Sequence, residues 1–135
     1  MQATPGEFEL IDQHLRSVGA SRTDVALGVG DDAALLTPAP DITLCVASAW
    51  ALCERDTEAL AKRLLAQAQH TLAANGATPA WATLSLTLPA PDPTWLAAFS
   101  RALHRVLANA GIALVGGDTT GGSNMVMLEL IGTKS

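Results

Sequence analysis

Charged side chains are scarce in this chain of 135 residues, of which only 16% are Asp, Glu, Lys or Arg. The eight Lys and Arg residues are scattered along the chain, and the formal net charge is −5. A broad nucleic-acid surface needs clustered positive charge, so this charge balance excludes one. Because 49% of the residues are hydrophobic, the chain can form a core and still leave apolar surface for an interface.

Cysteines and long apolar runs are also scarce. The two cysteines, Cys45 and Cys53, form no CxxC pair and have no metal-ligand spacing with histidine. No apolar stretch reaches membrane-spanning length, and the first seven residues lack the basic start and apolar core of a signal peptide. We therefore expect a cytoplasmic, reduced protein without a membrane partner, and its length suits one domain over residues 1–135.

Hydrophobic periodicity predicts an alternation of helices and strands. Helices are expected over 7–18, 57–75 and 93–110, with Asp56 or Thr57 and Asp92 as N-terminal caps. Strands are expected over 25–29, 42–48, 81–88, 112–115 and 125–131. This order predicts an α/β (α+β) domain with a mixed four-stranded sheet and helices on one face.

The other face of that sheet then needs a cover. The sequence offers no further helix, and a dimer that packs sheet against sheet would supply one. Alternation within the last strand places Glu129 on the same face as Met125, Met127 and Ile131.

Two acidic, glycine-containing turns are expected after strands. The first is Gly30-Asp31-Asp32-Ala33 and the second is Gly116-Gly117-Asp118-Thr119-Thr120-Gly121-Gly122. Carboxylate oxygens suit Mg²⁺, and a glycine-rich backbone lets phosphates approach closely, so the pair indicates Mg-nucleotide chemistry. The alternative is that Asp and Gly are ordinary turn residues here.

Several stretches, in order and nearly end to end, give the chain a family resemblance. It resembles the amino-terminal domain of thiamine-monophosphate kinase, within the superfamily of aminoimidazole ribonucleotide synthetase and selenophosphate synthetase. The matching stretches are Gly6-Glu7-Phe8-Glu9-Leu10-Ile11, Gly28-Val29-Gly30-Asp31-Asp32-Ala33-Ala34-Leu35-Leu36, Ala74-Asn75-Gly76-Ala77-Thr78-Pro79-Ala80-Trp81, Leu84-Ser85-Leu86-Thr87-Leu88-Pro89, Trp95-Leu96-Ala97-Ala98-Phe99 and Gly116-Gly117-Asp118-Thr119-Thr120.

The resemblance implies transfer of the γ-phosphoryl group of ATP to thiamine monophosphate, with several Mg²⁺ ions held by aspartates. It also implies a homodimer whose amino-terminal domains join into a β-barrel. Carried over to this chain, Asp31, Asp32 and Asp118 would be metal ligands. Gly117, Asp118, Thr119 and Thr120 would lie beside the phosphates of ATP or ADP.

The chain departs from the family pattern at two aspartates and in length. Ala49 and Thr71 stand where the family has metal-binding aspartates. The sequence stops just after the last strand of the family's first domain, so we expect a single-domain relative without the second domain, with a cut chain as the alternative. His70 and Glu54 are poor replacements, since imidazole suits Mg²⁺ badly and Glu54 lies in an unmatched loop. Trp50 has no family counterpart; we interpret it as core filling, with plugging of the old site or contact with a partner as alternatives.

Three functional hypotheses remain open at this stage. One is a dimeric structural or partner-binding module, whose protein partner would take the place of the missing domain. The second is a degenerate relative that retains weak binding of a Mg-nucleotide or another phosphate ligand. The third is an active ATP-dependent kinase, working with a separate second-domain chain. The missing carboxylates favour the first two, which together describe a pseudoenzyme.

Overall fold

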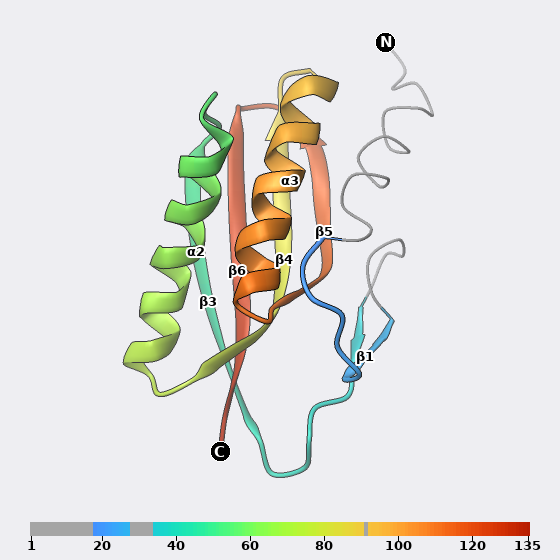
Figure 1. Ribbon diagram of the computed structural model, residues 1–135, viewed down its shortest axis with the longest axis vertical. Coiled ribbons are helices and arrows are strands. Elements are labelled where there is room, and N and C mark those ends of the chain that lie inside the picture. The colour runs from blue at the N-terminus through green and yellow to red at the C-terminus, as the bar shows by residue number, and fades with distance from the viewer. Residues whose placement is uncertain (1–17, 28–33, 91) are drawn as a thin grey trace.

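The computed structural model describes residues 18–27, 34–90 and 92–135. Asp31 and Asp32, and nearly all of the helix expected over 7–18, lie outside the described residues. Two helices, α2 (Thr57–Ala74) and α3 (Pro93–Asn109), lie on one face of a four-stranded sheet, as Figure 1 shows. The predicted architecture of a mixed four-stranded sheet with helices on one face is confirmed.

The sheet consists of β3 (Thr43–Leu52), β6 (Met125–Lys134), β4 (Thr78–Leu88) and β5 (Ala113–Gly121), in that spatial order. β6 pairs antiparallel with both β3 and β4, and β4 pairs parallel with β5. The parallel pair needs a long crossover, which α3 supplies. A separate two-stranded sheet, β1 (Val25–Leu27) with β2 (Leu35–Leu36), precedes these elements.

Local capping explains where the two helices begin and end. The Asp56 carboxylate accepts a hydrogen bond from the Ala59 amide at 3.0 Å, and Asp92 accepts one from the Trp95 amide at 3.0 Å. Both caps satisfy an amide that the first helical turn leaves without an intrahelical partner. Gly76 and Gly111 follow the helices with positive φ, which ends each helix at little steric cost. Neither of these two helices is long and apolar enough to cross a membrane.

The main core lies between the helices and the sheet. Its helical side chains include Leu60, Leu64, Leu72, Phe99 and Leu103, all fully buried. The strands contribute Leu84, Leu86, Leu128 and Leu130 from β4 and β6, and Ala47 and Ala49 from β3. Large side chains thus fill the middle of the layer, and alanines let α2 approach β3 closely.

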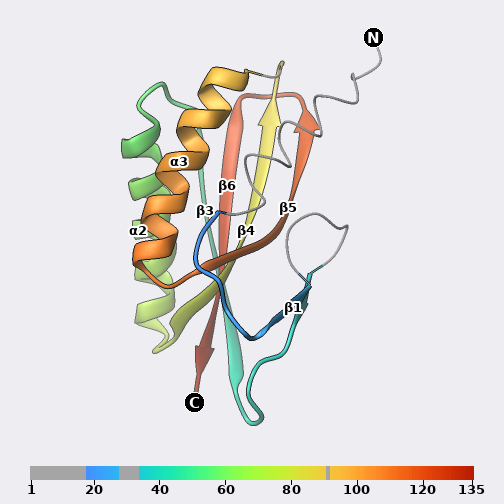
Figure 2. The same ribbon diagram turned by 45° about the vertical axis from the view of Figure 1, so that its right-hand side comes forward.

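The described residues cover the opposite face of the sheet, which we call the open face, at one end only. There the β1–β2 pair packs through Val25, Ala34 and Leu36 against a small cluster that contains Trp81 and Val115. In Figure 2 the helices and this pair lie on opposite sides of the sheet. The exposed part of the open face agrees with the expectation that this side of the sheet needs a cover.

β3 turns its large side chains outward. Val46, Trp50 and Leu52 lie on the open face with 56%, 63% and 64% of their surface exposed. The interpretation of Trp50 as core filling is therefore wrong. The pairing of β3 with β6 explains the inversion, because Ala49 lies opposite Leu128 and both must face the helices.

The glycine-rich segment expected to be a turn after a short strand is itself a strand. β5 continues past Val115 to Gly121, paired with β4 along its length, and the chain reverses only at residues 122–124. The register shifts by one residue near its start, so that Val115 is extra between the Ala82–Leu114 and Thr83–Gly116 pairs. This bulge lets Leu114 face the core while Asp118, four residues later, lies opposite Ser85 on the open face.

Gly117 is the point of closest approach between β5 and β4. It lies opposite Leu84, and a Cβ atom built on Gly117 would overlap the carbonyl group of Leu84. A Cβ atom on the preceding Gly116 would meet nothing within 4 Å. The two adjacent glycines therefore have different roles, and only Gly117 is required by the sheet.

We expect Gly117→Ala to lower the free energy of unfolding by at least about 2 kcal/mol, because the β4–β5 pair must separate to admit the methyl group. Gly116→Ala is the matched control and should change stability by less than about 0.5 kcal/mol. Urea unfolding followed by circular dichroism measures both. Equal effects of the two substitutions would contradict this assignment.

Candidate functional site

The open face is divided into an apolar half and a hydroxyl half. The apolar half, on β3 and β6, comprises the exposed side chains of Leu44, Val46, Trp50, Leu52 and Met127. The hydroxyl half, on β4 and β5, comprises Thr83, Ser85, Thr87, Thr120 and the carboxylate of Asp118. Strand pairing joins the two halves in a row across the sheet, from Trp50 through Met127 and Ser85 to Asp118.

Asp118 is the carboxylate that β5 places among these hydroxyl groups. Its side chain is exposed, and its Oδ1 accepts a hydrogen bond from the Thr119 amide at 2.9 Å. Nearby, the hydroxyl groups of Thr87 and Thr120 lie 3.3 Å apart, within hydrogen-bonding distance. A carboxylate beside several hydroxyl groups offers hard oxygen ligands for a cation and donors for phosphate oxygens.

The four residues expected beside phosphates are divided between the two faces of the sheet. Asp118 and Thr120 lie opposite Ser85 and Thr87, on the open face. Gly117 and Thr119 lie opposite Leu84 and Leu86, on the helix side. On this geometry Asp118 and Thr120 are the two of the four whose side chains face the open surface.

Positions 49 and 71, where the family resemblance places two further metal ligands, do not lie beside Asp118. Ala49 is buried beneath the helices, in the same row as Gly117 but three strands away. Thr71 is exposed on α2, where its hydroxyl group donates to the Gln67 carbonyl at 3.3 Å. Within the described ranges, no three His, Cys, Asp or Glu side chains come close enough to hold a metal ion. A three-carboxylate site at Asp118 would therefore need residues outside those ranges, such as Asp31 and Asp32.

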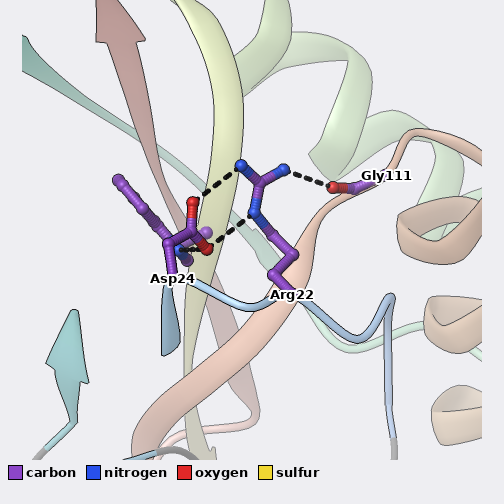
Figure 3. Close-up of polar contacts among 4 residues, drawn as sticks. Arg22, Asp24 and Gly111 are labelled. Carbon is purple, nitrogen blue, oxygen red and sulfur yellow. Dashed lines mark hydrogen bonds and ion pairs between the residues drawn. The ribbon is translucent and has the colours of Figure 1, made fainter. Parts of the chain in front are cut away.

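A polar cluster fastens the β1–β2 pair beside the hydroxyl half. The Arg22 guanidinium donates to both oxygens of Asp24 at 3.0 and 2.9 Å and to the Gly111 carbonyl at 3.1 Å, as Figure 3 shows. Asp24 also accepts a hydrogen bond from Nε1 of buried Trp81 at 3.0 Å. We call Arg22, Asp24 and Trp81 the latch. It joins the segment before β1 to β4 and to the turn that follows α3.

The latch perturbs the ionisation of Asp24. The hydrogen bonds from Arg22 hold the pKa of Asp24 below its ordinary value, and the Trp81 indole acts in the same direction. Partial burial opposes this shift, since it disfavours the charged carboxylate. The same hydrogen bonds raise the pKa of Arg22. Both groups are therefore charged at neutral pH, and the bidentate geometry is the strong form of an Arg–carboxylate pair.

Comparison with known proteins agrees with this α/β architecture of one sheet with helices on a single face. The model of the family "AIR synthase related protein, N-terminal domain" matches residues 30–133. The chain belongs to this family. It is 44% identical to the thiamine-monophosphate kinase of Escherichia coli strain K12 over 133 residues, and 33% identical to that of Haemophilus influenzae. These matches cover 94% of this chain but only 41% and 40% of the two kinases, so the chain spans about two-fifths of their length.

Solved structures give the same fold. The crystal structure of thiamine-monophosphate kinase from Stenotrophomonas maltophilia K279a is 32% identical with a TM-score of 0.76, and the match covers 98% of this chain and 43% of that one. A structure described as AaThiL complexed with AMPPCP and TMP is 22% identical with a TM-score of 0.64. That match covers 96% of this chain and 41% of the other, and it supports the fold alone.

We expect acid to weaken the latch. Because the folded pKa of Asp24 is below the unfolded value of about 3.9, Asp24 adds stability above that pH. This contribution is lost as pH falls through the folded pKa. Urea unfolding between pH 7 and pH 3 should therefore show a smaller loss of stability in Asp24→Asn than in the wild type. At pH 7 the variant should be less stable by about 1–3 kcal/mol.

Asp41→Asn is the control for this experiment, because Asp41 is an exposed turn residue. It should follow the wild-type pH profile. Parallel profiles for the wild type and Asp24→Asn would show that the latch does not stabilise the fold.

Proposed function

We propose that this chain is a thiamine-monophosphate-kinase-like amino-terminal domain that acts as a dimeric structural or partner-binding module and retains weak binding of a Mg-nucleotide or phosphate ligand. The observation that carries the proposal is the divided open face. Its apolar half suits association, and its hydroxyl half, around Asp118, suits a phosphate-bearing ligand. On this proposal the domain has no kinase activity by itself.

The apolar half supports association with a second copy. Five large apolar side chains are exposed together on β3 and β6, whereas isolated surface apolar residues need no explanation. β3 is also an edge strand, paired only with β6 among the described strands, so its outer backbone groups are free to meet another chain. The dimer implied by the family resemblance would cover this surface. The alternative is that a different protein, in the place of the family's second domain, covers the apolar half.

The hydroxyl half supports weak ligand binding rather than efficient phosphoryl transfer. Phosphoryl transfer relies on metal ions that neutralise the developing charge on the phosphates. In this chain Ala49 and Thr71 supply no carboxylate, and the proposed metal ligands are reduced to Asp31, Asp32 and Asp118. Mg²⁺ keeps several waters and needs few protein ligands, so one site could persist where a multi-metal cluster could not.

An active phosphotransferase that makes thiamine diphosphate from thiamine monophosphate is the alternative. The 44% identity to the Escherichia coli kinase favours it. This alternative requires the remaining three-fifths of the kinase length, either in the same protein or as a separate chain. It also requires catalysis without carboxylates at positions 49 and 71.

We expect the isolated chain to sediment as a species of about twice the 13.9 kDa chain mass. Val46→Lys should raise the dimer dissociation constant at least about tenfold, because it places a charge in the covered surface. Ala66→Lys adds the same charge at an exposed position of α2 and should have no effect. A wild type that remains a monomer at every concentration would contradict the proposed association.

We also expect calorimetry to detect binding of AMPPCP at about millimolar concentration, and only when Mg²⁺ is present. Asp118→Asn should abolish this binding, because it removes the carboxylate charge that faces the hydroxyl half. Asp41→Asn, which removes the same charge from a turn outside the open face, should bind as the wild type does. No heat of binding at several millimolar AMPPCP would rule out the retained ligand site. Release of ADP from ATP with thiamine monophosphate present would establish the alternative instead.

A further inference from the structure

Glu129 occupies the middle of the open face. Strand pairing arranges the outward residues of β3, β6 and β4 in successive rows across the sheet. In order these rows are Leu44 with Thr133, Val46 with Ile131 and Trp81, Ser48 with Glu129 and Thr83, Trp50 with Met127 and Ser85, and Leu52 with Met125 and Thr87. The row of Glu129 has two rows on either side. On β3 and β6 the carboxylate therefore lies between the exposed apolar rows of Val46 and Trp50, within the surface that the proposed dimer would cover. On the β4 side it borders Trp81, which the β1–β2 pair already covers.

In the part of the chain that the structure describes, no cationic side chain pairs with the Glu129 carboxylate. Its polar contact is with the Thr83 hydroxyl group, which donates to Oε1 at a long 3.4 Å. Along its own strand the outward neighbours are Met127 and Ile131. The side chain is half-buried before any partner arrives.

Charge at the centre of an interface has a different effect from charge at its rim. The centre loses its water most completely, and charged residues are depleted there. Taking an ionised carboxylate out of water is costly unless a cation or several hydrogen bonds replace the lost hydration. In a symmetric dimer each chain brings its own Glu129, so the cost applies twice.

We propose that Glu129 limits the strength of self-association, so that the domain forms a weak, reversible dimer instead of a permanent one. This inference rests on the dimer put forward above, and it concerns the affinity of that dimer. The apolar side chains on either side of Glu129 favour association, and its carboxylate opposes it. The described residues therefore contain both the driving force for the interface and the group that weakens it.

The test compares dimer dissociation constants measured by sedimentation equilibrium at neutral pH. Glu129→Gln keeps the size of the side chain and removes the charge, and Glu129→Thr removes the charge with a residue that favours strands. Both should lower the dissociation constant at least about tenfold relative to the wild type. Two chemically different replacements with the same effect would assign it to the lost charge. Far-UV circular dichroism and urea unfolding check that each variant keeps the fold.

Asp41→Asn is the matched control. It removes one negative charge from an exposed turn before β3, at a position with φ of 61°, which asparagine tolerates. General repulsion between chains of net charge −5 would be relieved equally by this variant and by salt. The control should change the dissociation constant less than about threefold, and the effect of Glu129→Gln should persist in about 0.5 M NaCl.

The outcomes separate this inference from the dimer on which it rests. Equal dissociation constants for the wild type and both Glu129 variants would overturn the role of Glu129 and leave the dimer standing. A gain in affinity that Asp41→Asn reproduces would also overturn it. Monomers for the wild type and for both Glu129 variants would overturn the dimer and this inference together. A wild type that dimerises only at high concentration, with Glu129 variants that dimerise at much lower concentration, would support the inference.

Discussion

The close approach of β5 to β4 at Gly117 is the constraint on which the rest of the site depends. Leu84 leaves no room for a side chain on the opposing strand, so β5 can continue along β4 only with glycine at that position. Asp118 follows directly and is thereby fixed on the open face beside Ser85. A carboxylate in a paired strand has fewer accessible positions than one in a loop, so its place among the hydroxyl groups is set before any ligand arrives.

Local chemistry in the sequence was sufficient to predict much of the fold. Asp56 and Asp92 mark helix starts because a carboxylate replaces the missing intrahelical acceptor, and this effect involves only the next three residues. Alternation from Trp81 to Leu88 likewise requires only that one face of a strand be buried. Each predicted helix has one apolar face, and it can bury that face by packing against the sheet. These features were predictable because neighbouring residues determine them.

The features that sequence reasoning missed depend on partners distant in the sequence. Gly116-Gly117-Asp118 has the composition of a turn, yet pairing with Thr83, Leu84 and Ser85 makes it a strand. Likewise, size alone favours burial of Trp50 rather than Ala49. The register of β3 with β6 instead buries Ala49 and exposes Trp50, because Leu128 and Leu130 face the helices. Because Asp31 and Asp32 lie outside the described residues, their part in the site stays a prediction.

The inverted pattern of β3 connects the proposed association with the proposed ligand site. β3 buries alanines and exposes valine, leucine and tryptophan. Covering these large side chains would remove apolar surface from water and so stabilise the complex that covers them. Trp50 lies in the same row as Asp118, separated by Met127 and Ser85, so whatever covers Trp50 also borders the hydroxyl half. A cover there would exclude water from the space beside Asp118 and strengthen its electrostatic interactions. Association and ligand binding at this face are therefore expected to affect each other, because both alter the hydration of the same rows of side chains.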